Sequence, residues 1–336
     1  MSKPISKPMS QRSNLSRRQC LAAAGAGALT LGFGSTRSSA AATTIRQGYQ
    51  TNIWGMPTYY LMKSGNLGKY GLTVEEFAVP SGNITMQQMV ARQVDLGTYA
   101  GPSFIIGNVK GGLVAIAMIE HVGKTARIIA RKDLNITKIE DLRGKRIANQ
   151  TGSSVGNDLV DIVLPHYGLN KGDYTEVRMD VNNMVAALAA KTVDAMANVE
   201  PYNVIAVADG IGTDLGDFSS FDTMPVFMAT TPDFLQKNPD AVVAYLKAWL
   251  DAANDFKSNA QKVNDVIYKF YADKGYKMSP EAFSTAMSRV EVTPSFPDLK
   301  SYMQQQAEIL VKSKIIQTIP DWSTALRPDF MEKAKA

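Results

Sequence analysis

Short apolar runs alternate with amphipathic segments from residue 45 to residue 230, and this alternation limits the fold more than any other feature of the sequence. Strands that follow one another with helices between them form parallel sheets, because each helix carries the chain back across the sheet. We therefore expect an α/β protein. Strands are predicted at residues 45–51, 72–79, 94–99, 113–119, 127–130, 175–178, 193–198 and 225–230, with one more at the start of 146–157.

Helical periodicity fills the segments between these strands and dominates the chain after Thr231. A fresh set of strands begins near residue 139, and residues 217–223 are expected to return the chain to the first set, so two domains are predicted. Helices are expected at 59–67, from the cap at 81–83 to 92, at 158–167, at 184–190 and from 201. The mostly helical C-terminal part is expected to contain helices at 232–237, 241–256, 262–272, 280–289 and 297–312.

Residues 1–42 have the three-part layout of a secretory signal peptide. A basic start leads through Arg17 and Arg18 into an apolar run at 21–33, and small residues at 40–42 offer a cleavage site. The paired arginines before a weakly apolar run predict export by the twin-arginine route. The apolar run has about 13 residues, against the roughly 20 that a membrane-spanning helix needs, which argues against an anchor.

Removal of this segment changes the charge of the chain. The segment holds six of the 36 basic residues and none of the 31 acidic ones, which leaves a formal net charge of −1. Such a balance gives no reason to expect nucleic acid or an anionic membrane as a partner. The single cysteine, Cys20, precedes the apolar run, whereas a lipid-anchored precursor would carry it afterwards. The mature chain therefore has no thiol and no disulfide, which suits an oxidising compartment.

The segment around Gly152, Ser153 and Ser154 joins a predicted strand to a predicted helix. Free backbone N–H groups, the positive end of the helix dipole and serine hydroxyls make such a turn a receptor for an anion. The alternative is a plain connection whose serines only cap the helix. Local sequence alone leaves both interpretations open.

The same turn contains the G-x-S-x-G pattern of serine hydrolases. Such an enzyme needs a histidine close to Ser154. His166 follows 12 residues later, which is about 18 Å along the predicted helix, and His121 precedes the serine. We therefore expect no catalytic residues of this type.

Motifs for metals and cofactors are also absent from the sequence. Two widely spaced histidines and no D-x-D-x-D run argue against a metal site. Neither a phosphate-binding P-loop nor a dinucleotide fingerprint is found. No metal and no cofactor are expected.

Eight segments, taken in order, resemble the periplasmic substrate-binding proteins of ABC importers of the nitrate, sulfonate and taurine type. Each segment alone is weak, but their order and spacing are typical of this family. They are GYQ (48–50) with Trp54 and Gly55, QVDLG (93–97), AGPS (100–103), KGG (110–112), DLRGKRIA (141–148), TGSS (151–154), VDAM (193–196) and EPY (200–202).

The resemblance implies an α/β, two-lobe periplasmic-binding-protein fold of the Venus-flytrap, type II-like kind, with a mostly helical C-terminal part. Lobe one would contain residues 43–128 and 224–336, and lobe two residues 129–223. The ligand would bind between the lobes, which close over it. The protein would then be an exported periplasmic monomer that performs no chemistry and delivers a small anion to ABC permease subunits in the inner membrane.

The resemblance also implies that helix N-termini and hydroxyls hold the anionic head group. From lobe two it assigns Gly152, Ser153 and Ser154, and from lobe one the turns that contain Gln50, Trp54, Gly55 and Ser103. Trp54 could pack on the body of the ligand, Tyr99 could donate a hydrogen bond, and Glu200 could meet a ligand amine. Asn198 and His121 are weaker candidates, and each of these five side chains also fits a purely structural role.

Two departures from the family pattern bear on the ligand. Sulfonate binders often carry an aromatic residue shortly before the Pro-Tyr pair, where this chain has Ala197, Asn198 and Val199. Val155 and Gly156 also replace the small and polar residues that often follow the serines. A sulfonate such as taurine or an alkane- or arylsulfonate is the leading expectation. The alternative ligands are an aromatic carboxylate, nitrate or a pyrimidine. The alternative function is that of an exported enzyme on the same fold.

The signal peptide generates a first prediction. Replacement of Arg17 and Arg18 by lysine should hold the precursor in the cytoplasm, because twin-arginine export depends on that pair. Immunoblots of cytoplasmic and periplasmic fractions measure the outcome, with the unaltered precursor as control. Normal export of the double variant would show that the segment uses another route.

Overall fold

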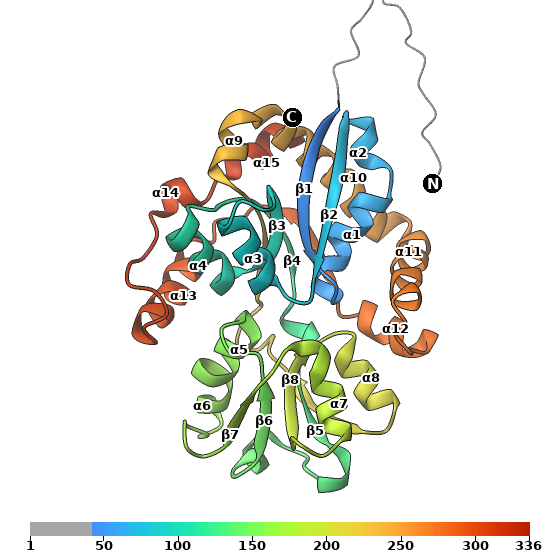
Figure 1. The fold of residues 1–336 in the computed structure, drawn as a ribbon, viewed down its shortest axis with the longest axis vertical. Coiled ribbons are helices and arrows are strands. Elements are labelled where there is room, and N and C mark those ends of the chain that lie inside the picture. The colour runs from blue at the N-terminus through green and yellow to red at the C-terminus, as the bar shows by residue number, and fades with distance from the viewer. Residues whose placement is uncertain (1–41) are drawn as a thin grey trace, which may run out of the picture. The chain divides into compact units, whose positions relative to one another are not determined.

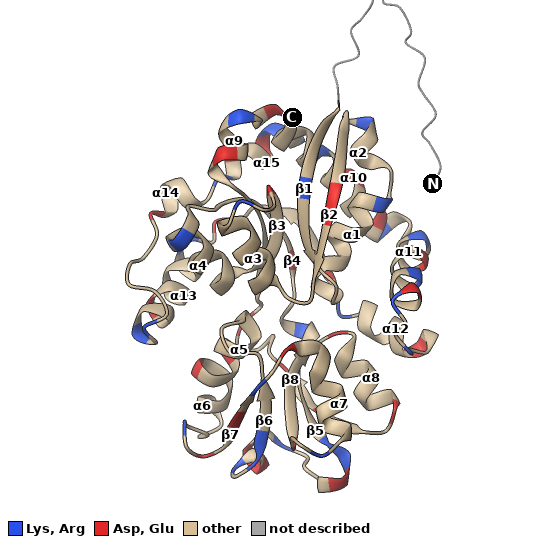
Figure 2. Ribbon diagram, viewed as in Figure 1, with Lys and Arg blue, Asp and Glu red and all other residues tan. Residues whose placement is uncertain are grey.

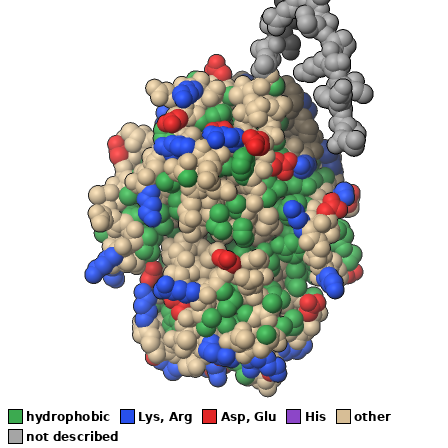
Figure 3. Space-filling model, in the orientation of Figure 1, with side chains coloured by type: hydrophobic (Ala, Val, Ile, Leu, Met, Phe, Trp, Pro, Cys, Tyr) green, Lys and Arg blue, Asp and Glu red, His purple; other side chains and the backbone are tan. Residues whose placement is uncertain are grey.

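The computed structural model describes residues 42–336, which build two lobes around two separate sheets (Figure 1). The expected signal peptide lies outside the described residues except for its last position, so the twin-arginine route stays a prediction. No helix within residues 42–336 is both long and apolar enough to cross a membrane. Acidic and basic side chains are interspersed on the face seen in Figure 3, which gives that face no field of a single sign.

Six strands form the sheet of lobe one, in the order β11-β4-β10-β3-β1-β2. β1 pairs in parallel with β2 and β3, whereas β10 runs antiparallel between β3 and β4, and β11 runs antiparallel to β4 at the edge. The sheet is therefore mixed rather than parallel throughout. Its strands are β1 (Thr43–Gln50), β2 (Leu72–Val79), β3 (Leu96–Ala100), β4 (Val114–His121), β10 (Pro225–Thr230) and β11 (Glu291–Ser295).

Five strands form the sheet of lobe two, in the order β7-β6-β8-β5-β9. β6 is parallel to β7 and β8, and β5 is antiparallel to β8 and β9. Both sheets thus have a parallel half with an antiparallel strand beside it. This strand is β10 in lobe one and β5 in lobe two, and each follows a crossing between the lobes. The strands are β5 (Ala126–Arg131), β6 (Arg146–Asn149), β7 (Thr175–Arg178), β8 (Ala195–Val199) and β9 (Gly212–Asp217).

The chain passes between the sheets twice, at residues 122–125 and at residues 218–224. β5 therefore belongs wholly to the second sheet, and the boundary expected after residue 128 falls inside this strand. An apolar run reveals that a strand is buried, but not which of two sheets it joins. The chain re-enters the first sheet with β10, which begins at Pro225.

Helices cover both faces of each sheet. In lobe one, α1, α2, α10 and α15 pack together on one side, and α3, α4 and α13 pack on the other (Figure 1). Lobe two carries α5, a π-helical turn (Leu159–Val163), α6, α7 and α8. The helices of lobe one before the crossing are α1 (Met56–Lys63), α2 (Asn66–Lys69), α3 (Gly82–Val90) and α4 (Gly101–Gly111). Those of lobe two are α5 (Ser154–Asp158), α6 (Leu164–His166), α7 (Met184–Ala189) and α8 (Tyr202–Ala208).

The C-terminal part is mostly helical, as expected. Trp249 on α10 is fully buried in the core of lobe one. β11 interrupts these helices and was not predicted, and β9 was also not predicted. The helices are α9 (Pro232–Lys237), α10 (Pro239–Ser258), α11 (Ala260–Asp273), α12 (Pro280–Met287), α13 (Lys300–Lys312), α14 (Trp322–Ala325) and α15 (Pro328–Lys335).

The helix expected from residue 158 begins four residues earlier. Ser153 caps it, because its hydroxyl accepts a hydrogen bond of 3.0 Å from the N–H of Gly156. Pro165 has no N–H to give to the carbonyl one turn before it, and the preceding turn widens so that Leu164 bonds to Leu159 instead. The serines thus form the first turn of the helix rather than the loop before it.

Gly55 generates a prediction on stability. A Cβ at this position would lie 1.8 Å from the backbone oxygen of Gln50, which cannot move without breaking the end of β1. Gly55→Ala should therefore lower the free energy of unfolding by about 3 kcal/mol, the upper range for overpacking. Urea unfolding followed by circular dichroism measures this.

Gly68 on α2 supplies the matched control. Apart from the backbone of its own helix and its chain neighbours, no atom lies within 4 Å of the position of an added Cβ. Gly68→Ala should leave stability unchanged or raise it slightly, because alanine is the better helix former. Equal stability of both variants would contradict the close approach at Gly55.

Candidate functional site

A small cavity of about 30 Å³ lies between the two lobes, with room for roughly two or three water molecules. Every residue that lines it is uncharged, so a charged ligand would meet only neutral groups of the protein. Lobe one contributes Asn52, Trp54, Ser81, Gly82, Asn83, Ala100 and Ser103, and lobe two contributes Gln150, Ser153, Ser154, Val155, Val181, Ala197, Asn198 and Val199.

Three helices begin at this cavity: α3, α4 and α5. They follow β2, β3 and β6, whose carboxyl ends meet at the cavity side of their sheets, where ligands of α/β proteins collect. The N–H groups of a first helical turn have no acceptor within the helix, and the helix dipole is positive there. α3 contains no charged residue that would offset this field (Figure 2).

Two serine hydroxyls face each other across the cavity. The Oγ atoms of Ser103 on α4 and Ser154 on α5 are 3.5 Å apart, and both residues are only 3% exposed. Either oxygen can be the donor, and each O–H can rotate toward a third group. The pair therefore offers one donor from each lobe to the same small volume.

Ser153 differs from Ser154, although both line the cavity. Its hydroxyl donates to the backbone oxygen of Gln150 at 2.7 Å and accepts from the N–H of Gly156. A hydroxyl has one proton to donate, so Ser153 keeps none for a ligand. Its role here is to cap α5 and to aim the free N–H groups of that turn.

Gln150 and Ser81 were not predicted as site residues, yet they join the two lobes at the cavity. The Nε2 atom of Gln150 donates to Oγ of Ser81 at 3.4 Å and to Oδ1 of Asp180 at 3.3 Å. Ser81 lies at the N-cap of α3. A strand, a serine at the N-cap position and a helix follow one another there, as they do at Ser153. This shared pattern could have identified the turn.

Trp54 and Asn198, both predicted, also line the cavity, but their polar atoms are engaged elsewhere. The indole N–H of Trp54 donates to Oγ1 of Thr125 at 2.6 Å. The side-chain amide of Asn198 donates to the oxygen of Val181 at 2.9 Å and accepts from the N–H of Val199 at 2.8 Å. Trp54 therefore presents an aromatic surface to the cavity, and Asn198 presents a backbone that its side chain holds in place, rather than free donors.

Four of the other predicted residues lie behind the cavity or outside it. Gln50 is fully buried beneath Gly82, where an added Cβ would lie 2.7 Å from its Nε2 atom. Tyr99 is fully buried, donates to the sulfur of Met89 at 3.3 Å, and has a raised pKa because of that burial. Gly55 and Gly152 do not line the cavity either.

His121 lies in a separate open groove beside α10, α11 and α12. Its strand, β4, ends next to β10 and β11 at that groove rather than at the interlobe cavity. His166, which a hydrolase would need, packs its ring against Phe221 at 5.0 Å between centroids. Within residues 42–336, no group of three or more His, Cys, Asp or Glu is placed to hold a metal ion.

Glu200 does not face the cavity, which corrects its expected role with a ligand amine. The residue is 0% exposed, and its carboxylate forms an ion pair with Arg289 and accepts from the N–H of Val204 at 3.0 Å. Burial raises the pKa of Glu200, and Arg289 opposes that rise. The carboxylate is thus committed to the protein itself.

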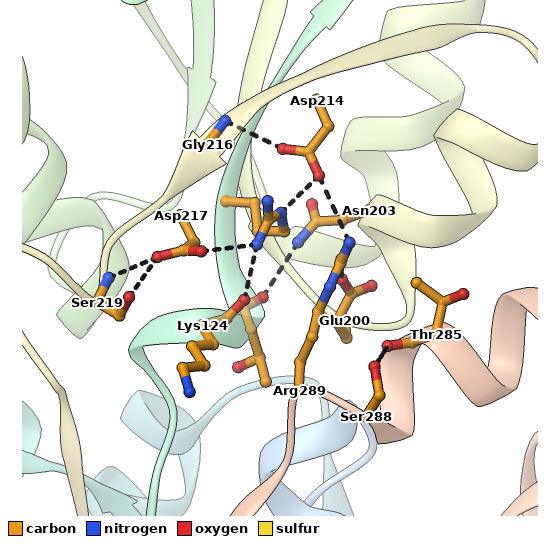
Figure 4. A network of polar contacts seen from close by, with 12 residues as sticks. Lys124, Glu200, Asn203, Asp214, Gly216, Asp217, Ser219, Thr285, Ser288 and Arg289 are labelled. Atoms are coloured by element: carbon orange, nitrogen blue, oxygen red, sulfur yellow. Dashed lines mark hydrogen bonds and ion pairs between the residues drawn. The ribbon is translucent and has the colours of Figure 1, made fainter.

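A network of ion pairs extends from this pair (Figure 4). Arg289, which follows α12, also lies 3.6 Å from Asp214 on β9. Arg127 on β5 contacts Asp214 at 2.6 Å and Asp217 at 3.0 Å. The network therefore ties the sheet of lobe two to the segment between α12 and β11 of lobe one.

A pair of buried carboxyls, Asp158 and Asp222, lies behind Ser154. Asp158, one helical turn along α5, is 2% exposed, and its neighbour Asp222 is 5% exposed. Tyr302 and Gln306 donate to Asp222 at 2.9 Å and 2.8 Å. Burial raises the pKa of both carboxyls, and their mutual repulsion raises that of Asp158 further. A shared proton would limit the negative charge close to the cavity.

Comparison with known proteins gives a family and several relatives. The family model described as NMT1/THI5 like matches residues 55–262. A protein of Brucella abortus, named as a binding protein, is 28% identical over 234 residues, which cover 67% of this chain and 71% of that protein. The taurine-binding periplasmic protein of Escherichia coli is 24% identical over 193 residues, 56% of this chain and 59% of that protein.

Solved structures confirm the expected fold. The alkanesulfonate-binding protein of Xanthomonas axonopodis pv. citri, bound to MOPS, superposes with a TM-score of 0.73 at 19% identity, over 84% of this chain and 98% of that chain. The periplasmic nitrate-binding protein of Synechocystis PCC 6803 superposes with a TM-score of 0.67 at 17% identity, over 87% and 88%. The chain thus has the two-lobe periplasmic-binding-protein fold.

The buried ion pair generates a prediction. Arg289→Met should lower the free energy of unfolding by about 3 kcal/mol, the lower end for breaking a buried pair because Arg289 is itself partly exposed. The double variant Glu200→Gln, Arg289→Met should recover much of this loss, since it leaves no buried charge. Lys124→Met, which breaks the exposed pair with Glu291, is the control and should cost less than about 1 kcal/mol.

The deficit of Arg289→Met should also depend on pH. Removal of Arg289 raises the pKa of Glu200 further, and a raised carboxyl pKa contributes stability that is lost as the pH rises through it. The difference in free energy of unfolding between the variant and the wild type should therefore be smallest in acid and grow toward neutral pH. A deficit that is constant with pH would show that Glu200 carries no unpaired charge in the variant.

Proposed function

The chain belongs to the NMT1/THI5-like family, and we propose that it is the solute-binding protein of an ABC importer, which captures a small organic anion between its lobes. One observation carries this proposal: three helix N-termini and two buried hydroxyls converge on a cavity without a charged side chain. Free N–H groups at positive helix ends stabilise an anion without a buried counter-ion. The protein then binds and releases its ligand without chemistry.

The size of the cavity favours a compact head group with several acceptor oxygens. About 30 Å³ holds roughly two or three water molecules, so only a compact group fits there. A sulfonate has three oxygens, which can accept from both serines and from the free N–H groups of the helix turns at once. The relative named for taurine and the structural neighbour named for alkanesulfonate, which holds the organic sulfonate MOPS, support a sulfonate.

The cavity favours an alkane- or arylsulfonate over taurine. Taurine carries an ammonium group, and a buried ammonium without a partner is costly. None of the described residues that line the cavity is acidic, and Glu200, the expected partner, is bound to Arg289. Nitrate is the second candidate, because its three oxygens and small size also fit this volume.

Export to the periplasm and delivery to permease subunits complete the proposal. The predicted signal peptide and the periplasmic relatives support this location. The closed pair of lobes would present the loaded protein as a monomer to the permease.

The two facing serines provide the test. Ser154→Ala and Ser103→Ala should each weaken binding of the cognate anion by about 10-fold or more, since a hydrogen bond to a charged group contributes roughly 1.5–3 kcal/mol. Isothermal titration of the purified protein measures the affinities. The ligand is first identified by a thermal-shift screen of alkane- and arylsulfonates, taurine, nitrate, phthalates and pyrimidines.

Ser153→Ala is the matched control. It should lower the free energy of unfolding by about 1 kcal/mol through loss of the helix cap, with a smaller effect on affinity than Ser154→Ala. Unchanged affinity in both the Ser154 and Ser103 variants would contradict the proposed head-group site. If an uncharged compound stabilised the protein more than every anion in the screen, the proposal that the ligand is an anion would be contradicted.

A further inference from the structure

An open groove of about 360 Å³ adjoins the interlobe cavity. Apolar side chains of α3, α4 and the segment after α13 form most of its wall, namely Met86, Val90, Ile106 and Ile315. Asn83 and Gly152 form the end next to the cavity. The groove is more than ten times as large as the cavity itself.

Helical spacing places the groove next to the cavity. Asn83 on α3 lines both, and Met86 and Val90 follow it at three and seven residues along the same helix face. On α4, Ser103 lines the cavity and Ile106 lines the groove one turn later. Both helices start at the cavity, so the groove leads away from the proposed head-group site.

The polarity of the two spaces differs along this path. The cavity offers hydroxyls and helix N-termini, whereas the groove offers methyl and methylene groups. Of the residues that line the groove, Lys110 at the far end of α4 is the only charged one, and none is acidic. A terminal ammonium would therefore find no counter-ion there, and an unsubstituted hydrocarbon chain would bury apolar surface.

We propose that this groove is the subsite for the apolar chain of an amphiphilic organic anion whose head group occupies the interlobe cavity. This inference rests on the proposed function, because it needs the head group in place between α3, α4 and α5. It names the ligand more closely: a linear anion with a hydrocarbon chain of several carbons, not a bare inorganic ion. The chain leaves the cavity past Asn83 and lies between Met86, Val90, Ile106 and Ile315.

A homologous series tests the subsite. Linear alkanesulfonates from methane- to octanesulfonate are titrated calorimetrically into the full chain purified after export. Burial of one methylene contributes about 0.8 kcal/mol, which corresponds to roughly fourfold in affinity, so affinity should rise about threefold or more per carbon until the groove is filled. A flat series with measurable binding of methanesulfonate would overturn the subsite and leave the proposed function standing.

Gln87→Trp narrows the groove without touching the cavity. Gln87 is exposed on α3 and lines only the groove. The variant should lose at least tenfold in affinity for octanesulfonate and less than twofold for methanesulfonate. Gln305→Trp on α13, exposed and outside both spaces, is the control and should bind every member of the series as the wild type does.

Ile315→Ser provides a second, independent variant that removes apolar wall instead of filling space. It should flatten the dependence on chain length while the affinity for methanesulfonate stays within about twofold. Equal losses for the short and the long sulfonate in both variants would overturn the subsite. Absence of binding by every sulfonate, whatever its length, would overturn the proposed function and the subsite with it.

Discussion

The buried ion pair between Glu200 and Arg289 is the interaction on which the arrangement of the two lobes depends. A fully buried carboxylate is tolerated only with a partner, and here the partner comes from the other lobe. The backbone oxygen of Glu200 also accepts a hydrogen bond of 3.0 Å from the N–H of Ile53, next to Trp54 at the cavity. One residue of lobe two therefore holds both the C-terminal segment and the first cavity-lining turn of lobe one.

Thr125, in the first crossing, completes this junction. Its backbone oxygen accepts from Asn203 and from the N–H of Glu200, each at 3.2 Å, while its hydroxyl accepts from the indole of Trp54. The crossing is thus bonded to both lobes within a few residues.

The electrostatic design of the cavity follows from where the carboxylates lie. Helix dipoles and neutral donors each contribute only a partial charge. A full negative charge close to such a site would therefore weaken its attraction for an anion. Glu200 is neutralised by Arg289, and burial favours the protonated form within the Asp158 and Asp222 pair. These acids therefore oppose the positive field of α3, α4 and α5 less than unpaired carboxylates in the same places would.

The sequence predicted the fold class and most strands to within about two residues, because apolar runs and glycine turns are local signals. It could not assign β5 to a sheet or detect β9 and β11, since strand pairing depends on partners far along the chain. Trp54, Ser103, Ser153, Ser154 and Asn198 were predicted and do line the cavity, because each sits at the end of a strand or the start of a helix. Glu200 has the same local setting, but its partner Arg289 lies 89 residues away. No local sequence pattern indicates this ion pair.

The facing serines explain how binding and closure would be coupled in the proposed receptor. Ser103 and Ser154 belong to different lobes, and a head group can accept from both only when their oxygens are close, as they are here at 3.5 Å. Such a ligand binds the closed arrangement more tightly than an open one by about the free energy of the second set of hydrogen bonds. A ligand shifts a conformational equilibrium only by this difference in affinity. The donors shared between lobes, rather than the total number of contacts, therefore determine how far an anion favours closure.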